Sequence, residues 1–231
     1  MRRITALLWD IDGTLLDFIA AERIGIRKTF AEYRLGECTD EMLSDYDRIN
    51  AKHWEMLERG ECTKHETMTH RFVEFFALYG LDADPEAFND TYQRHLPETI
   101  VFCPHAWETV QALRREYRQF CVTNGNLPVQ QRKLRDSGLD TVFGHCFISD
   151  EVGAEKPSLA FFNVVLSAIG CAPEEALVIG DSLSSDILGA NQSNIPCVWY
   201  NPSGKPIKGD VHADYEIRDL GELPDLLKRI Q

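Results

Sequence analysis

The second half of the chain alternates short apolar runs with longer amphipathic stretches. The apolar runs are "QFCVT", "HCFIS", "ALVIG", "PCVWY" and a closing "DYEI". Helical patterns such as "LPVQQRKLRDSG" and "SLAFFNVVLSAIG" separate them. Short strands that are apolar on both faces and alternate with helices are typical of a parallel sheet covered on both sides by helices. Because "ITALLW" near the N-terminus has the same apolar character, we expect it to join this sheet in a Rossmann-like α/β core.

The stretch between about Asp17 and His95 shows only helical patterns. Thr63 and Glu66 form a capping-box pattern, and Asp84 precedes a proline in the order typical of a helix start. Further helices are expected to end at glycines, namely Gly36, Gly60 and Gly80. We therefore predict an α-helical domain at residues 17–96, inserted after the first strand of a core formed by residues 1–16 and 97–231.

The composition is that of a soluble globular protein, with 231 residues, 44% hydrophobic and 26% charged. Seven cysteines occur without a CxxC pair, which favours free thiols in a reducing cytoplasm. The first apolar run breaks at Asp10, far short of the about 20 residues that a membrane span needs. The net charge of −13 argues against nucleic acids and anionic membranes as partners. We expect a cytoplasmic monomer or homodimer whose partner is a small phosphorylated substrate.

The unusual polar clusters fall at the ends of predicted strands. "WDIDGT" follows the first strand, "VTNGN" ends the next, "IGDSLSSD" follows a later one, and "GAEKPS" comes after "CFISDEV". Because ligands of open α/β sheets bind beyond the carboxyl ends of the strands, we expect one common site there. Asp10 and Asp12 are two residues apart and would point to the same side of an extended chain, so their repulsion requires positive charge nearby.

The side chains of these segments suit a metal ion and a phosphate group. Asp10 and Asp181, with Asp186 as a further candidate, offer the hard oxygen ligands that Mg²⁺ prefers. A hydroxyl, a turn with accessible backbone amides and a compact ammonium group can bind phosphate oxygens. The phosphate-binding candidates are Thr123, Asn124 and Lys156.

Asp10 and Asp12 are the candidate catalytic residues. An ionised carboxylate needs no base to activate it, so Asp10 is the candidate nucleophile. A protonated Asp12 could give its proton to the leaving alkoxide and then deprotonate the attacking water. Mg²⁺ and Lys156 would stabilise charge on the phosphoryl oxygens. The pattern therefore predicts a Mg²⁺-dependent phosphomonoesterase.

Four motifs in this order, "DIDGT", "VTNGN", "EKP" and "GDSLSSD", resemble those of the haloacid dehalogenase-like superfamily of aspartyl-phosphate phosphohydrolases. The resemblance covers nearly the whole chain. It implies an aspartyl-phosphate intermediate on Asp10 and a metal site formed by Asp10, Asp181 and the backbone carbonyl of Asp12. It also implies that Asp186 supports Lys156 and the metal shell, and that the helical insertion is a cap of the first type, which closes over the site.

Within the superfamily, "DYDRINAKHWEMLERGECT…HRF" and "SDEVGAEKP" resemble the bacterial pyrimidine 5′-nucleotidase subgroup. This resemblance implies hydrolysis of nucleoside monophosphates, including noncanonical pyrimidines. The alternatives that share all four motifs are a phosphatase for sugar phosphates or phosphoglycolate, and a phosphomutase. A carbon–halogen hydrolase is disfavoured because Asp12 and Asp181 would have no role, and a non-enzymatic binding module because no motif residue is missing.

Several side chains of the helical insertion have more than one interpretation. Its aromatic residues are expected mainly in a core, with one or two left to stack on a base: Trp54, Phe72, Phe75, Phe76 and Tyr79. Lys52, His53 and Arg71 are expected at solvated helix positions, with substrate contact as the alternative. "HETMTH" does not fit a zinc protease motif, because His65 and His70 are five residues apart instead of four.

Overall fold

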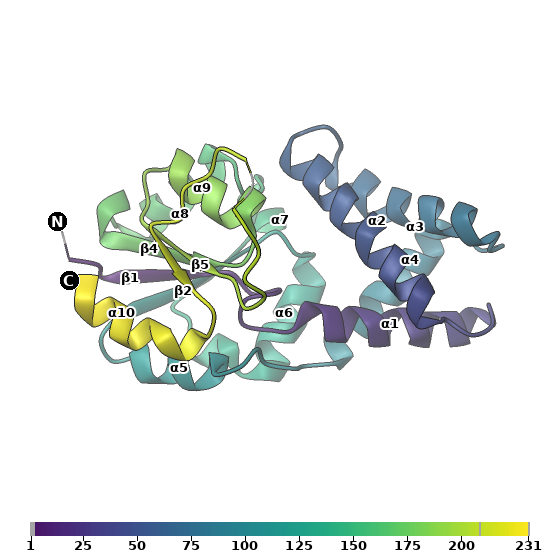
Figure 1. The fold of residues 1–231 in the computed structure, drawn as a ribbon, viewed down its shortest axis with the longest axis horizontal. Helices are drawn as coiled ribbons and strands as arrows, with labels where there is room; N and C mark the ends of the chain where they lie inside the picture. Colours follow the sequence, from purple (N-terminus) through teal and green to yellow (C-terminus); the bar gives the residue numbers. More distant parts are fainter. Residues whose placement is uncertain (1–2, 208, 231) are drawn as a thin grey trace. The chain divides into compact units, whose positions relative to one another are not determined.

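The structure is a computed structural model that describes residues 3–207 and 209–230. The chain forms two compact units (Figure 1). One comprises Met1–Phe18 and Ile100–Gln231, and is called the α/β unit here. The other is Ile19–Thr99, the helical unit. The helical unit interrupts the sequence of the α/β unit shortly after its first strand.

A six-stranded parallel sheet forms the centre of the α/β unit, in the order β3-β2-β1-β4-β5-β6. The first strand, β1, is therefore a central strand between β2 and β4. This arrangement confirms the predicted Rossmann-like α/β class. The strands are β1 (Ala6–Trp9), β2 (Arg118–Thr123), β3 (Cys146–Ile148), β4 (Ala176–Gly180), β5 (Cys197–Tyr200) and β6 (Tyr215–Ile217).

Helices cover both faces of this sheet, which explains why its central strands are apolar on both sides. Leu7 and Trp9 of β1 belong to the core on one face, and Ala6 and Leu8 to the core on the other. The first core is closed by α5 (Ala106–Leu113), α6 (Leu127–Ser137) and α10 (Leu223–Ile230), and the second by α8 (Leu159–Ile169) and α9 (Leu188–Gln192) (Figure 1).

The sequence did not indicate the short turns of helix between these elements. A four-residue helix, α7 (Ser149–Val152), follows β3. The helical pattern "LSSDILGANQS" does appear in the sequence, and the structure forms it as a π-helical turn at Leu183–Ile187 followed by α9. The 3-10 turns lie at Leu96–Glu98, Leu139–Thr141, Pro173–Glu175 and Leu220–Glu222.

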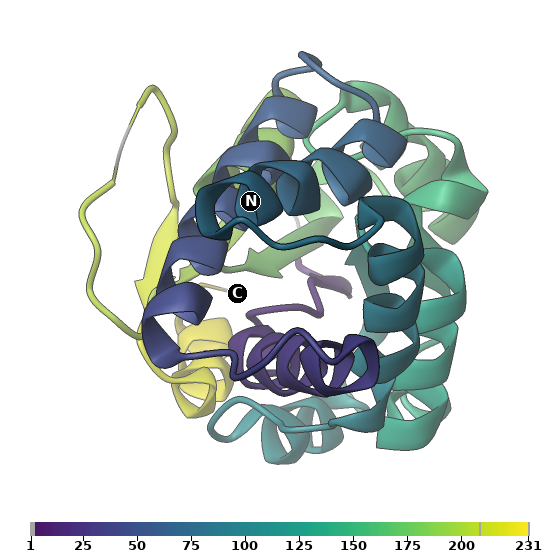
Figure 2. The same ribbon diagram turned by 90° about the vertical axis from the view of Figure 1, so that its right-hand side faces the viewer.

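The helical unit consists of α1 (Phe18–Tyr33), α2 (Asp40–Glu58), α3 (Lys64–Tyr79) and α4 (Pro85–His95) (Figures 1 and 2). The predicted caps are confirmed: Thr63 and Glu66 form a reciprocal capping box, Asp84 caps α4, and α3 ends at Gly80, whose φ is 62°. These local signals hold because each satisfies backbone groups that a helix end leaves unpaired.

Aromatic rings fill the interior of the helical unit. Tyr46 stacks on Phe72 with ring centroids 5.2 Å apart, and Phe72 lies 5.0 Å from Phe88. The expectation that the aromatic residues form mainly a core is confirmed for Phe72, Phe75 and Phe76, which are buried. No helix in the described ranges is long and apolar enough to cross a membrane.

Candidate active site

The candidate site lies at the carboxyl ends of β1, β2 and β4, three adjacent strands. Asp10 directly follows β1, and its backbone N–H donates to the Ile179 carbonyl oxygen at 2.9 Å, which continues the pairing with β4. Thr123 is the last residue of β2, and Asp181 follows the last residue of β4. Parallel strands end at the same edge of a sheet, so segments far apart in sequence meet there as predicted.

Two motif glycines leave the space into which the carboxylates fit. A Cβ at Gly13 would lie 2.6 Å from Oδ2 of Asp181, and the φ of Gly13 is +95°, a backbone conformation that favours glycine. A Cβ at Gly180 would collide with the side chain of Asp186. The glycines of "DGT" and "GDS" are therefore needed for the close approach of the acidic side chains.

Three carboxylates gather at this edge. One oxygen from each of Asp10, Asp181 and Asp186 lies within 4.8 Å of the others, and we call these three residues the acidic cluster. Nζ of Lys156 donates to Oδ1 of Asp10 at 2.8 Å, to Oδ1 of Asp186 at 2.6 Å and to the Val122 carbonyl at 2.9 Å. The lysine side chain is 2% exposed. The structure thus brings four predicted site residues together at this edge, with Lys156 in direct contact with Asp10 and Asp186.

Burial and mutual repulsion shift the pKa values in this group. Burial raises the pKa of Asp10 well above its ordinary value, although Lys156 opposes this. Burial and the nearby Asp186 raise the pKa of Asp181 to about 7. Burial would lower the pKa of Lys156, but the carboxylates of Asp10 and Asp186 outweigh it and raise that pKa above its ordinary value. The lysine is therefore charged, and a further positive charge nearby would stabilise the ionised form of the acids.

The acidic cluster fits a divalent metal ion. With all three carboxylates ionised, as they would be around a bound cation, one ammonium group leaves two negative charges without compensation. Carboxylate oxygens are hard ligands, which suit Mg²⁺ better than the softer transition metals. Asp10, Asp181 and Asp186 are the residues that could hold the ion.

Thr14 is a contributor that the sequence reasoning missed. Its hydroxyl lies 2.9 Å from Oδ2 of Asp10 and 3.2 Å from Oδ1 of Asp181, and it accepts the backbone N–H of Asp181 at 3.1 Å. The indole N–H of Trp199 donates to the backbone oxygen of Asp181 at 2.9 Å. Thr14 stands within the quoted motif "DGT" and could have been found, whereas no sequence signal marks Trp199.

Thr123 and Asn124 lie beside Lys156, but their side chains have protein partners. The hydroxyl of Thr123 accepts the N–H of Gly125 at 3.0 Å. The amide of Asn124 donates to the Lys156 carbonyl and accepts the Lys156 N–H, both at 2.8 Å. The side chain of Asn124 therefore holds the backbone of the lysine, and phosphate binding at this turn stays a prediction.

Asp12 has partners different from those of Asp10. Nζ of Lys133 lies 2.6 Å from its Oδ1, and Nε2 of Gln130 donates to its Oδ2. Because β1 ends at Trp9, the two-residue alternation of a strand does not fix the direction of Asp12. The sequence reasoning missed Gln130 and Lys133, and the available signal was two polar residues on the buried face of a predicted helix.

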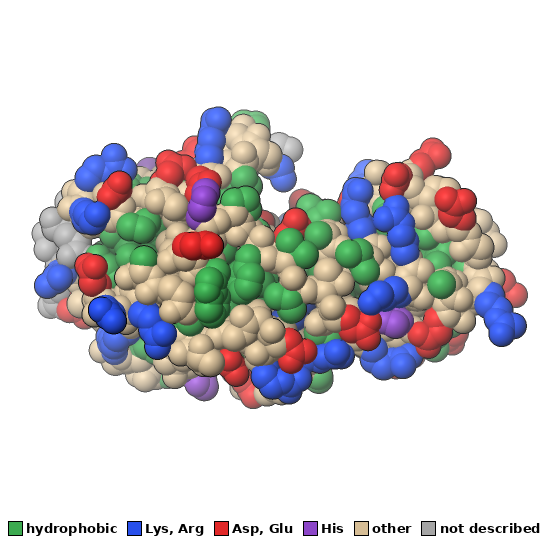
Figure 3. All heavy atoms as spheres, turned by 90° about the horizontal axis from the view of Figure 1, so that it is seen from below, with side chains coloured by type: hydrophobic (Ala, Val, Ile, Leu, Met, Phe, Trp, Pro, Cys, Tyr) green, Lys and Arg blue, Asp and Glu red, His purple; other side chains and the backbone are tan. Residues whose placement is uncertain are grey.

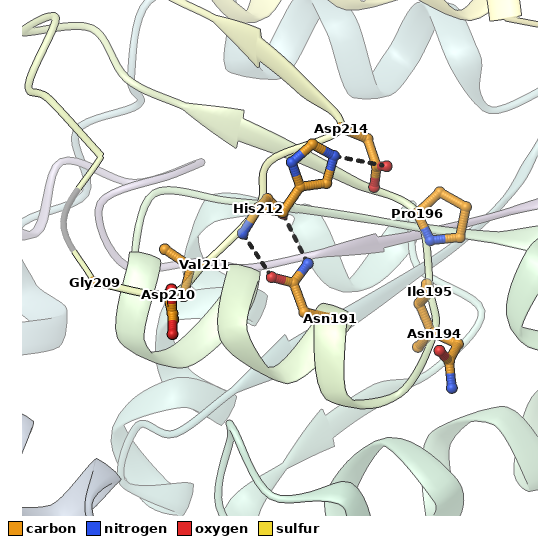
Figure 4. Close-up of a pocket in the computed structure, with 9 residues that line it drawn as sticks. All are labelled: Asn191, Asn194, Ile195, Pro196, Gly209, Asp210, Val211, His212 and Asp214. Carbon is orange, nitrogen blue, oxygen red and sulfur yellow. Dashed lines mark hydrogen bonds and ion pairs between the residues drawn. The ribbon is translucent and has the colours of Figure 1, made fainter.

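A pocket in another part of the α/β unit contains none of the predicted site residues. Residues 191, 194–196, 209–212 and 214 line it (Figure 4). The amide of Asn191 donates to the His212 carbonyl at 2.7 Å and accepts the His212 N–H at 2.8 Å. Nε2 of His212 is 3.7 Å from Oδ1 of Asp214.

Lys52, His53 and Arg71 of the helical unit have partners within that unit. Arg71 and His53 are 1% and 7% exposed, so the expectation that they are solvated is wrong. Arg71 donates to side chains contributed by two other helices, and His53 lies 3.0 Å from Glu74. Lys52 is exposed, as expected, and also pairs with Glu74.

The chain is similar to several characterised or structurally solved proteins. The family model described as haloacid dehalogenase-like hydrolase matches residues 7–200. A putative HAD-hydrolase of Bacillus subtilis, YfnB, is 36% identical over 98% of this chain and 97% of its own length. A crystal structure of YfnB bound to magnesium superposes with a TM-score of 0.93, covering 98% of this chain and 99% of that one, at 35% identity.

Two relatives with named activities align over similar lengths. The pyrimidine 5′-nucleotidase PynA of Streptococcus pneumoniae is 31% identical, over 96% of this chain and 94% of its own. A glyceraldehyde 3-phosphate phosphatase of Pyrococcus furiosus is 30% identical, over 99% of this chain and 95% of its own. The predicted resemblance is therefore confirmed: the chain belongs to the haloacid dehalogenase-like hydrolases, as a phosphohydrolase of that superfamily.

Proposed function

We propose that this phosphohydrolase is a Mg²⁺-dependent 5′-nucleotidase that acts on pyrimidine nucleoside monophosphates through a phosphorylated Asp10. The observation that carries the proposed chemistry is the pair of aspartates with different surroundings at the end of β1. Asp10 belongs to the acidic cluster with Lys156, whereas Asp12 contacts Lys133 and Gln130. Two carboxyl groups with separate partners can perform two separate tasks, attack and proton transfer.

Asp10 performs the first step. A carboxylate oxygen of Asp10 attacks phosphorus, and the bond from phosphorus to the ester oxygen breaks as the new bond forms. Lys156 and Thr14 hold the carboxylate in place, since each contacts a different oxygen of Asp10. Bound Mg²⁺, held by the acidic cluster, would supply positive charge to the phosphoryl oxygens.

Asp12 moves the protons. Its carboxylic acid gives a proton to the leaving ester oxygen, which departs as an alcohol. Its carboxylate then takes a proton from the water that attacks the phosphorylated Asp10. Inorganic phosphate leaves and the Asp10 carboxylate is restored.

The helical unit is proposed to act as the cap that selects the substrate. The resemblance of its segment to pyrimidine 5′-nucleotidases and the full-length similarity to PynA support a pyrimidine nucleotide. The charge balance supports a small substrate over a polymer. The chain carries a formal net charge of −13 at pH 7. On the face seen in Figure 3, the Lys and Arg side chains are interspersed with Asp and Glu.

A sugar-phosphate phosphatase is the second candidate, favoured by the Pyrococcus relative at nearly the same identity. Phosphate release would be measured for dUMP, UMP, dTMP, purine nucleotides, glucose 6-phosphate and phosphoglycolate, with and without Mg²⁺. We expect kcat/KM to be highest for the pyrimidine nucleotides, because a pocket matched to a pyrimidine rejects the larger purine ring. If kcat/KM for a sugar phosphate exceeds that for the nucleotides by about tenfold, roughly 1.4 kcal/mol, the nucleotidase proposal is refuted and only the general phosphatase activity remains.

A further inference from the structure

Helix α6 directs two buried polar side chains at Asp12. Lys133 and Gln130 are three residues apart, so they are neighbours on one face of the helix. They are 2% and 1% exposed, and they donate to the two different oxygens of the Asp12 carboxyl group. We propose that Lys133 and Gln130 are positioning residues that orient Asp12 for proton transfer, an inference that rests on the proposed function.

Gly125 provides the space that the Gln130 contact requires. A Cβ at Gly125 would lie 2.6 Å from Cδ of Gln130 and would collide with Nε2. The φ of Gly125 is not in the left-handed region, so its backbone conformation does not call for glycine. Glycine is required here because the side-chain amide of Gln130 occupies the space that a Cβ would fill. The glycine of "NGN" therefore serves the contact with Asp12.

A role in packing alone explains Gln130 less well. Its Oε1 is buried and has no hydrogen-bond partner among the residues that the structure describes. A glutamine placed only for stability would satisfy both ends of its amide, as most buried polar groups do. Here one end is left unpaired while the other contacts Asp12. The position of the amide is therefore explained by its hydrogen bond to Asp12.

Two donors on one carboxyl group fix its rotation without using all its acceptor positions. A carboxylate offers about four lone-pair positions, so a proton or a water molecule still has access. Asp12 must deliver its proton to the ester oxygen as the bond to phosphorus breaks, and later accept one from water. Both transfers depend on distance, and a displacement of about 1 Å can cost on the order of 10²-fold in rate.

The test compares substrates that differ in their need for a proton. Lys133→Met and Gln130→Leu would be assayed at saturating Mg²⁺ with p-nitrophenyl phosphate and with the alkyl phosphate that the wild type hydrolyses fastest. On the alkyl phosphate we expect kcat to fall about 10- to 10²-fold, with KM changed by less than about twofold. On p-nitrophenyl phosphate the loss should be at least about fivefold smaller, because its leaving group needs little protonation.

Controls separate positioning from folding. Arg132→Met changes a basic residue of the same helix whose side chain is 42% exposed and pairs with Asp136, and it should leave both activities unchanged. Lys133→Arg should retain most of kcat. If a thermal melt shows that Lys133→Met does not fold, Lys133→Arg and Gln130→Leu are the variants that test the proposal. In an Asp12→Asn background, Lys133→Met should cause no further loss on the alkyl phosphate.

Equal losses on the two substrates, an effect on KM alone, or a full additional loss in the Asp12→Asn background would each overturn the positioning role. A wild-type protein without phosphatase activity on either substrate would overturn the proposed function itself, and this inference with it. The two failures are therefore distinguishable.

Discussion

Lys156 of the α/β unit and Arg71 of the helical unit are both buried positively charged side chains, and their surroundings differ in charge balance. In the α/β unit, Lys156 contacts two carboxylates and a third lies close by. In the helical unit, Arg71 donates to Oδ1 of Asn50 at 2.7 Å and to Oδ1 of Asn89 at 3.0 Å. Nδ2 of Asn50 donates to Glu22 at 2.9 Å, which links the arginine to a single carboxylate.

The balance of charge separates a structural network from a functional one. Arg71 and Glu22 carry opposite charges, and Arg71 also lies over the rings of Phe72 and Tyr92, with distances of 5.0 and 5.4 Å to the centroids. These two charges balance each other and are linked through the side chain of Asn50, so the contacts can stabilise the helical unit without a ligand. The acidic cluster holds three carboxylates against one lysine, and burial with mutual repulsion raises the pKa values of Asp10 and Asp181, a perturbation typical of functional sites.

The largest expected effect is on catalysis, from Asp10→Asn. An amide is a poor nucleophile, so kcat should fall by at least roughly 10⁴-fold. The melting temperature of the metal-free protein should stay the same or rise, because one repelling carboxylate is removed from the cluster. Phosphate release and a thermal melt measure the two effects. Residual activity within about tenfold of wild type would show that Asp10 is not the nucleophile.

Removal of metal should also act on one network and not on the other. EDTA should abolish phosphatase activity and Mg²⁺ should restore it, because the acidic cluster lacks compensating charge. Mg²⁺ at 100 times its Kd should stabilise the folded protein by about 2.7 kcal/mol and so raise the melting temperature. Asp181→Ala should make this rise smaller. Arg71→Met should leave the Mg²⁺-dependent rise in place. Full activity in EDTA would contradict the assignment of the metal site.

The sequence predicted those features that depend on neighbours along the chain. The capping box of Thr63 and Glu66, the cap at Asp84 and the apolar strands each follow from a few adjacent residues. The approach of Asp10 to Lys156 was also predictable, although they are 146 residues apart, because a parallel sheet brings its strand ends together.

The missed features depend on contacts that no periodic pattern encodes. The Lys133 contact with Asp12 joins residues 121 apart through the direction of two side chains. The sequence pattern around Arg71 on α3 is compatible with either an exposed or a buried arginine. Its burial depends on the partners Asn50 and Asn89, which come from two other helices. An arginine is rarely buried unless paired, so its partners had to be known first.

Arg71→Met should have the largest effect on the stability of the helical unit. The change leaves Glu22, Asn50 and Asn89 without the buried cation, and breaking a buried charge network by removing one partner costs about 3–5 kcal/mol. Urea unfolding monitored by circular dichroism measures the loss. The double variant Arg71→Met/Glu22→Gln should be less destabilised than the sum of the single variants, since the two charges are coupled. Additive losses would show that the two charges act separately.

The smallest effect is expected where a charged pair is exposed. Nζ of Lys52 lies 2.8 Å from Oε2 of Glu74, and the Lys52 side chain is 54% exposed. Lys52→Met should change the free energy of unfolding by only about 0.2–1 kcal/mol, because water screens such pairs. The hydrogen bond from Lys52 lowers the pKa of Glu74 in the folded protein. The stabilisation is therefore present above the ordinary Glu pKa of about 4.3 and is lost as the pH falls below it.

Urea unfolding of wild type and Lys52→Met at pH 7 and at pH 3 would test this dependence. We expect the small difference at pH 7 to shrink at pH 3, while the deficit of Arg71→Met persists relative to wild type as long as both proteins remain folded. A deficit of Lys52→Met as large as that of Arg71→Met would mean that burial does not separate the two pairs. Charge alone would then account for the contribution of both side chains to the stability of the helical unit, and the burial of Arg71 would add nothing.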